Sequence, residues 1–368
     1  MVAFLSVTRI INSLKLEHRP LNKDFGRPQG NAGGHTMTAK TNITSSFEPA
    51  PPRPVPALQC YLAYGSALLT GIIAWWWLQS RQIMENPLWI GLTVTGISTV
   101  VVWVFSIAND NSSIYDPYWV IAPPLLALAL KAASGGGLLG SWHTRQIIIV
   151  SCLCVWASRY HIFYAWSGWR SGLEHEDWRY EAMRRAPVPY WLNSLLGMHL
   201  FPTALVYFAF APAALVLLSD ASSQPVFGLW DLLGMASALS AVTIEFLADR
   251  QLRTYRASKD YERGGTLRRG LWKYSRHPNY FGEALFWLSM VPFAVAAGML
   301  RRHPALVLGG PIMMALFFRY SCRLMDVRSL QRRPGYQRVI DEVSAMIPWW
   351  PKSRRYDRQS SSAHQAGS

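Results

Sequence analysis

The chain has 368 residues, of which 51% are hydrophobic and 15% charged, and it contains 17 tryptophans. Apolar stretches of about twenty residues, long enough to cross a bilayer as a helix, recur along it. This composition argues against a soluble protein and predicts an all-α, polytopic bundle of about seven or eight transmembrane helices.

The two ends of the chain differ in composition from the region between them. Residues 1–56 are rich in proline near 51–56 and in Gly, Asn, Thr and Ser near 29–46. Such segments cannot bury an apolar core, so we expect a disordered cytosolic arm and, at 351–368, a disordered tail. A weak basic, amphipathic character near the start leaves a mitochondrial presequence as the minor alternative. The membrane domain is predicted over 57–350, with 166–350 richest in site residues.

Eight apolar stretches are expected to cross the membrane. They lie at 57–78, 88–107, 118–132, 145–165, 191–218, 226–248, 281–299 and 304–320. An even number of crossings puts both termini on one side. The stretch 118–132 is short, and 281–320 is also compatible with a re-entrant pair, which leaves the number of crossings open.

Basic residues are distributed very unevenly about these stretches. The net charge is +15, and 30 of the 36 Lys and Arg residues fall in four segments: 1–56, 166–190, 248–280 and 319–368. Lys and Arg collect on the cytosolic face, so both termini are predicted to be cytosolic. Arg301 and Arg302 are exceptions. No nucleic-acid-binding module accompanies the charge, so nucleic acid is not expected as a partner.

No metal site is expected. Cys152 and Cys154 lie about 200° apart around a helix, so they do not share a ligand-binding face. His175 stands beside Glu174, Glu176 and Asp177, but no second histidine follows at ligand spacing. We expect free thiols and a pairing or solvated role for the acidic residues.

A polar stripe continues one of the predicted spans into the longest basic loop. Glu245, Asp249, Arg253 and Arg256 are spaced so that they project within an arc of about 80° on one helix face. A carboxylate inside an apolar span persists when it faces a polar cavity or an arginine. The alternative is an acid–arginine pair that only ends the helix.

The loop after the stripe has features that suit phosphate binding. Gly264, Gly265 and Gly270 break the helix, and further basic residues surround the turn before Pro278. Guanidinium groups bind phosphate oxygens, and glycines let backbone N–H groups approach them. No G-x-G-x-x-G or Walker sequence is present, so the loop predicts a nucleotide site without a Rossmann or P-loop fingerprint.

Four motifs carry a resemblance to a known family. The segment 270–283 reads Gly-Leu-Trp-Lys-Tyr-Ser-Arg-His-Pro-Asn-Tyr-Phe-Gly-Glu. The other three are Asp-Pro-Tyr-Trp at 116–119, His-Glu-Asp-Trp-Arg-Tyr at 175–180 and the stretch 332–349. Together they resemble the steroid 5α-reductase family over roughly 60–350, closest to its poorly characterised branch of membrane reductases. Isoprenylcysteine methyltransferases and sterol C14 reductases share a looser Arg-His-Pro-x-Tyr motif.

The resemblance implies an NADPH-dependent reductase of the endoplasmic reticulum that reduces a carbon–carbon double bond conjugated to a carbonyl in a bilayer lipid. Matched by motif position, Asn279 and Glu283 would lie by the nicotinamide, and Asp249, Arg253 and Arg256 by the adenosine and phosphates. Val339 replaces a tyrosine of the family pattern. The full set of residues implied to contact the cofactor is Asp249, Arg253, Arg256, Arg276, His277, Asn279, Tyr280, Glu283, Asp326 and Tyr336.

Hydride addition to an enone places negative charge on the carbonyl oxygen, so an acid must stand near it. The loop before 118–132 offers Asp116, whose pKa the lipid boundary would raise, and Tyr118. Both also fit a helix cap within an interfacial aromatic belt.

Two other functions remain as alternatives. An S-adenosylmethionine-dependent isoprenylcysteine or phospholipid methyltransferase would share Arg-His-Pro-x-Tyr, but its cofactor has no phosphates for the basic loop. A non-catalytic sterol-binding protein would bind lipid and no nucleotide. The sequence leaves the lipid and the oligomeric state undetermined.

Overall fold

The computed structural model describes residues 53–134, 137–166 and 172–352. The described residues form helices joined by loops, together with one pair of two-residue antiparallel strands, β1 (Val55–Pro56) and β2 (Gly172–Leu173). The long helices are α2 (Ala57–Ser80), α3 (Pro87–Ala108), α4 (Tyr115–Ala133), α5 (Thr144–Trp166), α8 (Phe201–Leu218), α9 (Leu229–Arg256), α11 (Pro278–Leu288) and α14 (Pro304–Arg332). The shorter helices are α6 (Trp178–Arg184), α7 (Tyr190–Asn193), α10 (Lys259–Glu262), α12 (Met290–Ala296), α13 (Met299–Arg302) and α15 (Gln337–Glu342).

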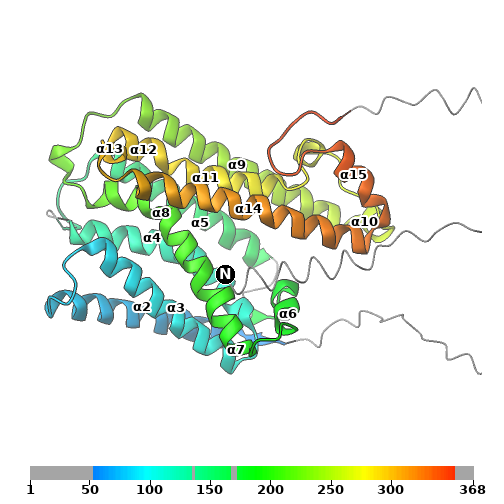
Figure 1. The fold of residues 1–368 in the computed structure, drawn as a ribbon, viewed down its shortest axis with the longest axis horizontal. Helices are drawn as coiled ribbons and strands as arrows, with labels where there is room; N and C mark the ends of the chain where they lie inside the picture. Colours follow the sequence, from blue (N-terminus) through cyan, green and yellow to red (C-terminus); the bar gives the residue numbers. More distant parts are fainter. Residues whose placement is uncertain (1–52, 135–136, 167–171, 353–368) are drawn as a thin grey trace, which may run out of the picture.

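Five helical segments are long and apolar enough to cross a bilayer. They are 57–80, 87–108, 190–218, 229–256 and 304–332, and they make the chain an integral, polytopic membrane protein. The prediction of an all-α membrane bundle is confirmed, whereas the number of seven or eight crossings stays a prediction. Helices α4, α5 and α11 lie among the five (Figure 1).

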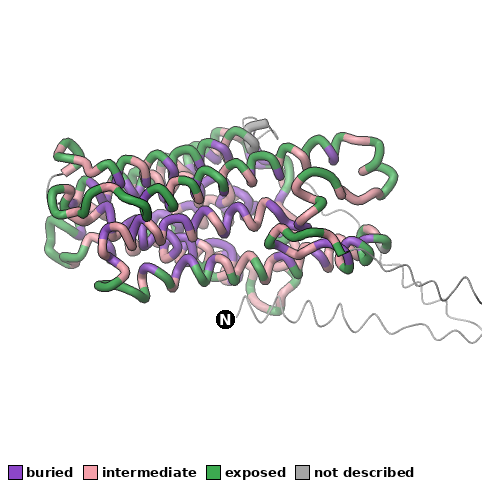
Figure 2. Tube along the Cα trace, turned by 90° about the horizontal axis from the view of Figure 1, so that it is seen from above, coloured by how far each residue is buried: buried purple, intermediate pink, exposed green. Residues whose placement is uncertain are grey.

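Burial follows the arrangement expected of helices in lipid. The buried residues run along the middle of the bundle and the exposed ones cover its outside (Figure 2). Helix α2 exposes Trp76 and Trp77 by 67% and 48%, although both are large and apolar. Apolar side chains on the outside need no protein partner where lipid is the solvent, so these two tryptophans face outward, whereas Trp75 packs against the core.

Helix α8 forms the centre of the bundle, packed between α4 and α14. It follows a π-helical turn (Ser194–Leu200). In the continuous helical segment 190–218, 67% of the 18-residue apolar stretch is buried. Gly310 of α14 allows this packing, since a Cβ there would lie 1.8 Å from the carbonyl oxygen of Phe208. The central core also contains Trp156 of α5 and Trp287 of α11, both fully buried.

The structure shows one helix that continues beyond a predicted span and one predicted boundary that was wrong. Helix α14 continues to Arg332, beyond the predicted limit at 320, because a helix that leaves the hydrocarbon can continue through polar residues. The arm predicted over 1–56 is ordered at its end, where β1 pairs with β2 and Arg53 forms an ion pair with Glu176 at 2.9 Å. The rest of the arm, 1–52, and the tail from 353 lie outside the described residues.

The stretch predicted at 281–299 is divided into two helices. Pro278 lacks an N–H and stands at the start of α11, where none is needed. The chain then passes through Ser289 into α12 and turns at Gly298, whose φ is +72°. In Figure 1, α11 and α12 follow one another along the bundle to α13 at the opposite end from α10 and α15.

Candidate functional site

The four motif segments converge on one end of the bundle, where α6, α10 and α15 lie (Figure 1). Asp116 accepts a hydrogen bond from the Tyr180 hydroxyl at 2.6 Å, which joins the first two segments. Arg328 stacks on Trp178 at 3.9 Å from the ring centre, and Arg276 binds the carbonyl of Ile340 at 2.9 Å. Segments far apart in the chain therefore build one polar region.

A cluster of charges lies between α5, α9 and α11. Arg159 of α5 contacts Glu245 at 2.6 Å and Asp249 at 2.8 Å, and Glu283 of α11 lies 3.7 Å from it. Arg159 and Glu245 are buried. Three carboxylates thus face one guanidinium, and we call these four residues the acidic cluster. Such an excess of acceptors favours a retained proton or a ligand that donates hydrogen bonds.

Glu283 is held by two indoles. Trp156 donates to one of its oxygens at 3.2 Å and Trp287 donates to the other at 2.9 Å. Both donors are buried aromatic residues of the core, so they fix the direction of the carboxylate and limit its access to water.

Asn279 joins the acidic cluster from the first turn of α11. Its amide nitrogen lies 3.4 Å from an Asp249 oxygen, and its own oxygen accepts from the backbone N–H of Tyr280 at 3.1 Å. Asp249, Asn279 and Glu283 therefore form one site in space. This differs from the assignment implied by the resemblance, which put Asp249 by the adenosine and phosphates and the other two residues by the nicotinamide. Arg159 belongs to this site and was missed, although it was the only Lys or Arg within the predicted span 145–165 apart from Arg145 at the edge.

A second group of predicted cofactor residues is engaged in contacts within the protein. Arg276 forms two bonds with Asp326, at 3.1 and 2.8 Å, and His277 lies 3.0 Å from the same carboxylate. Arg276 also donates to the carbonyls of Ile340 and Val343. These bonds connect α11, α14 and the C-terminal segment, which is a positioning role that the motif comparison did not anticipate.

Tyr280 and Tyr336 also pack within this part of the protein. The Tyr280 ring stacks on His277, with 5.6 Å between ring centres. Tyr336 is buried in a small core with Val339, the residue that departs from the family pattern. Val339 therefore contributes packing at its position.

Arginines gather where α9 and α14 end. Arg253 and Arg256 are exposed on α9. Arg328 of α14 lies within electrostatic range of Arg256, Arg332 and Arg179. One of its guanidinium nitrogens, Nη1, is buried and has no hydrogen-bond partner among the described residues. Arg179, Arg256, Arg328 and Arg332 form what we call the arginine cluster. Only Arg256 was predicted, since the others lie outside the loop 248–280.

The two predicted catalytic residues point in different directions. Asp116 lies against Tyr180 of α6, and burial raises the pKa of Asp116 to about 7, although Arg179 opposes this increase. Tyr118, two residues further along α4, lines a narrow pocket between α3, α4 and α8. The two side chains therefore do not form a single acid pair.

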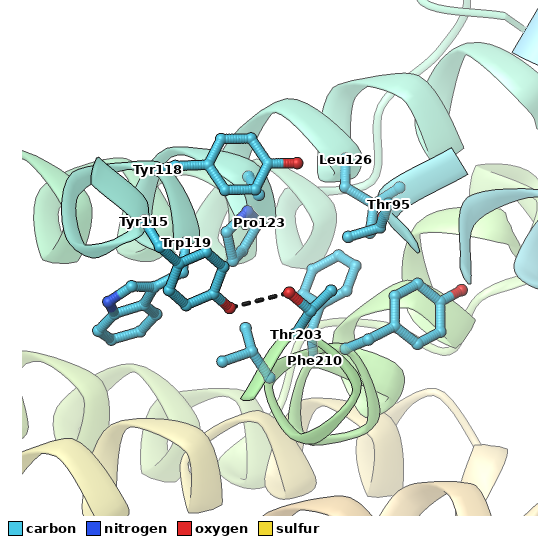
Figure 3. Close-up of a pocket in the computed structure, with 11 residues that line it drawn as sticks. Thr95, Tyr115, Tyr118, Trp119, Pro123, Leu126, Thr203 and Phe210 are labelled. Atoms are coloured by element: carbon cyan, nitrogen blue, oxygen red, sulfur yellow. Dashed lines mark hydrogen bonds between the residues drawn. The ribbon is translucent and has the colours of Figure 1, made fainter. Parts of the chain in front are cut away.

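The pocket has an apolar wall and a few hydroxyl groups (Figure 3). The Tyr115 hydroxyl lies 2.8 Å from Thr203, which in turn lies 3.0 Å from Thr99. The cavity volume is about 20 Å³, which is room for about one water. Its lining residues are Thr95, Tyr115, Tyr118, Trp119, Ala122, Pro123, Leu126, Thr203, Val206, Tyr207 and Phe210.

An aromatic wall separates the pocket from the acidic cluster. Trp119 lines the pocket and contacts Trp156, with 5.7 Å between ring centres. Trp156 in turn donates to Glu283. The acidic cluster and the pocket are therefore neighbours, separated by the indole rings of Trp119 and Trp156.

Comparison with known proteins gives the chain a family. A model described as "Protein of unknown function (DUF1295)" matches residues 102–343, a range that contains the acidic cluster, the arginine cluster and the pocket apart from Thr95. The chain belongs to the DUF1295 family. A curated relative in Schizosaccharomyces pombe, uncharacterized protein C594.04c, is 27% identical over 286 residues, which cover 72% of this chain and 80% of the relative. No solved structure matches this DUF1295 chain.

Among the described residues, no group of three or more His, Cys, Asp or Glu side chains has an arrangement that would hold a metal ion. The acidic cluster itself contains a guanidinium where a cation would lie. We therefore interpret the cluster as a site for hydrogen-bond donors.

Proposed function

We propose that this protein is a membrane reductase that uses NADPH to reduce a carbon–carbon double bond conjugated to a carbonyl in a lipid. The observation that carries the proposal is the order of groups along α9. The acidic cluster and Asn279 lie at one level, and the arginine cluster follows within a few turns. A dinucleotide carries an amide at one end and phosphates towards the other, so it needs such an order.

The residues present fit that cofactor at both ends. The carboxamide of the nicotinamide donates hydrogen bonds, and the acidic cluster holds carboxylate oxygens in excess of its one arginine. Oε2 of Glu245 pairs with Arg159 at 2.6 Å, whereas Oε1 has no hydrogen-bond partner among the described residues. The buried Nη1 of Arg328 is a donor without an acceptor in the described chain. An unsatisfied buried guanidinium nitrogen is costly, and a phosphate oxygen would satisfy it.

When bound, the cofactor would supply a hydride. The chain's own residues would provide the rest: Asn279 and Glu283 orient the amide, Arg256 and Arg328 bind phosphate oxygens, and the two indoles around Glu283 exclude water. Hydride addition to the β-carbon of an enone leaves an enolate, which a proton donor at the carbonyl oxygen stabilises until the carbon next to the carbonyl takes up a proton and the saturated ketone forms. Tyr118 lines the pocket and is our proposed donor, whereas Asp116 supports Tyr180 from the other face of α4.

The distribution of basic residues indicates on which side of the membrane the proposed cofactor site lies. The described parts of the basic segments and the four motifs share one end of the bundle (Figure 1), and Lys and Arg favour the cytosolic face. We therefore place the cofactor site and both termini in the cytosol, the lipid substrate in the bilayer and, from the resemblance to 5α-reductases, the protein in the endoplasmic reticulum.

A titration of the purified protein tests the proposal against its alternatives. Fluorescence should report saturable binding of NADPH, weaker binding of NADH and none of S-adenosylmethionine. Asn279→Ala and Arg253→Ala should weaken NADPH binding. Arg250→Ala is the matched control, because Arg250 is exposed on α9 but lies off the polar stripe. Binding of S-adenosylmethionine alone would indicate a methyltransferase, and sterol binding without either cofactor would indicate a non-catalytic protein.

A further inference from the structure

Three large apolar side chains are exposed in the C-terminal segment after α15. Ile347, Trp349 and Trp350 are 60%, 70% and 71% exposed. They belong to none of the five membrane-length segments and take no part in the proposed cofactor site. Exposed tryptophans in a polar part of a protein indicate an interaction surface.

This segment is fixed to the bundle by hydrogen bonds. The backbone N–H of Trp349 donates to the Tyr274 carbonyl at 2.9 Å, and the Trp350 ring packs against Tyr274 with 5.3 Å between ring centres. Ser275 forms a β-bridge with Ser344, and its hydroxyl donates to the Met346 carbonyl at 2.7 Å. The exposed tryptophans are therefore held in place.

The attachment point sets the level of the tryptophans along the bundle. Trp272, two residues before Tyr274, donates from its indole to the carbonyl of Ala248 at 3.1 Å. Ala248 is the last residue of the apolar part of α9, and Asp249 and Arg250 follow it. Figure 1 shows the segment after α15 bending back towards the bundle. The tryptophans thus lie near the level at which α9 leaves the hydrocarbon.

The charges around the tryptophans are mainly positive. Arg269, Lys273 and Lys352 are exposed nearby in the chain. Hydrogen bonds from Arg338 and Arg268 lower the pKa of Glu342 to about 2, and both arginines neutralise its charge. Asp341 is an exposed acid of the same segment and makes a bond with Gln337. The patch therefore carries a positive excess.

We propose that Ile347, Trp349 and Trp350 insert into the headgroup layer of the same membrane, with Arg269, Lys273 and Lys352 on anionic phospholipids. Indole rings prefer this interfacial layer, and basic residues beside it are attracted to anionic lipid. This C-terminal surface would hold the turn before Pro278 and the C-terminal segment against the bilayer. The inference is independent of the proposed reductase activity.

Spin labelling of the full chain in nanodiscs tests the proposal. Trp350→Cys, in a chain whose four cysteines are replaced by alanine, carries a nitroxide at the C-terminal surface. The label should be more accessible to oxygen than to a nickel chelate. A label at Gln337→Cys, an exposed position of α15, should show the reverse order. Replacing about 30% of the phosphatidylcholine with phosphatidylserine should deepen the label at 350, and Lys273→Gln should reduce that response.

Three results would overturn the proposal. They are equal nickel accessibility at 350 and 337, protection of 350 from both reagents, which would indicate a protein partner, and a depth that does not respond to phosphatidylserine.

A chain with its native cysteines provides a second measurement. Quenching of tryptophan emission by brominated lipids should fall in a Trp349→Phe, Trp350→Phe variant, and an unchanged quenched fraction would also contradict insertion.

Discussion

Gly282 of α11 lies against Glu245 of α9 so closely that a Cβ at 282 would stand 2.5 Å from the Glu245 Cγ. The same Cβ would lie 3.0 Å from the Ala241 carbonyl oxygen. The absence of a side chain at 282 therefore sets the distance between α9 and α11, and with it the approach of Glu245 and Glu283.

Gly282→Ala should push the two helices apart. Overpacking of this kind costs roughly 1–3 kcal/mol, so we expect a lower thermal midpoint in detergent and weaker NADPH binding. Gly309→Ala is the control, because nothing lies within 4 Å of a Cβ at that position. Equal midpoints for the two variants would show that α11 can move without cost.

Arg159→Leu should leave three carboxylates without their shared cation. Breaking a buried ion pair by removing one partner costs about 3–5 kcal/mol, so this variant should unfold at a much lower temperature. Adding Glu245→Leu removes one of the unpaired charges and should recover part of the loss. If the double variant were no more stable than Arg159→Leu, the pairing at 2.6 Å would contribute little.

Asp116 should make stability depend on pH. Burial raises its pKa to about 7 from the ordinary value of 3.8, so the folded protein retains this proton over a range in which the unfolded chain has lost it. Its contribution to stability is full below the ordinary value and decreases as the pH rises towards 7. Thermal midpoints measured from pH 5 to 8 should therefore decrease more steeply for the wild type than for Asp116→Asn.

Arg328→Gln removes the guanidinium whose Nη1 is buried without a partner in the described chain. A charged hydrogen bond to phosphate contributes about 1.5–3 kcal/mol, so the dissociation constant for NADPH should rise roughly ten-fold or more. Its matched control is Arg338→Gln, which changes an exposed arginine of α15. Isothermal titration at several salt concentrations would measure both, and unchanged affinity in Arg328→Gln would place the phosphates elsewhere.

Arg276→Ala should release the C-terminal segment. The side chain binds Asp326 and the carbonyls of Ile340 and Val343, so its loss leaves both carbonyls without this donor and Asp326 with only His277. We expect faster proteolytic cleavage between 333 and 352 at unchanged helix content. A cleavage rate equal to that of the wild type would mean that Arg276 is free to serve a ligand instead.

Sequence patterns predicted the parts of this fold that depend on short-range spacing. The apolar lengths located most helices, and the spacing of Glu245 and Asp249 placed both on one face of α9. The partner of both residues, Arg159, lies on α5, and no spacing rule connects residues about ninety positions apart. Its isolation within an apolar stretch was the available signal, because a base in such a stretch needs an acid.

The roles of the motif residues were harder to predict. The Arg-His-Pro motif indicated a ligand site, yet Arg276 and His277 both bind Asp326, which became visible only once α14 was known to continue past 320. Asp116 and Tyr118 were both predicted as candidates for the acid near the carbonyl oxygen. Residues two apart on a helix point about 200° apart, so they meet different neighbours.

The small volume beside Tyr118 has a mechanical consequence. In the proposed reductase, a lipid such as a sterol or polyprenyl chain is many times larger than one water, so its entry would have to spread α3 and α4 away from α8 and displace neighbouring acyl chains. Turnover would then depend on how readily the surrounding bilayer yields, and stiff, ordered membranes should slow the protein even when its cofactor is saturating.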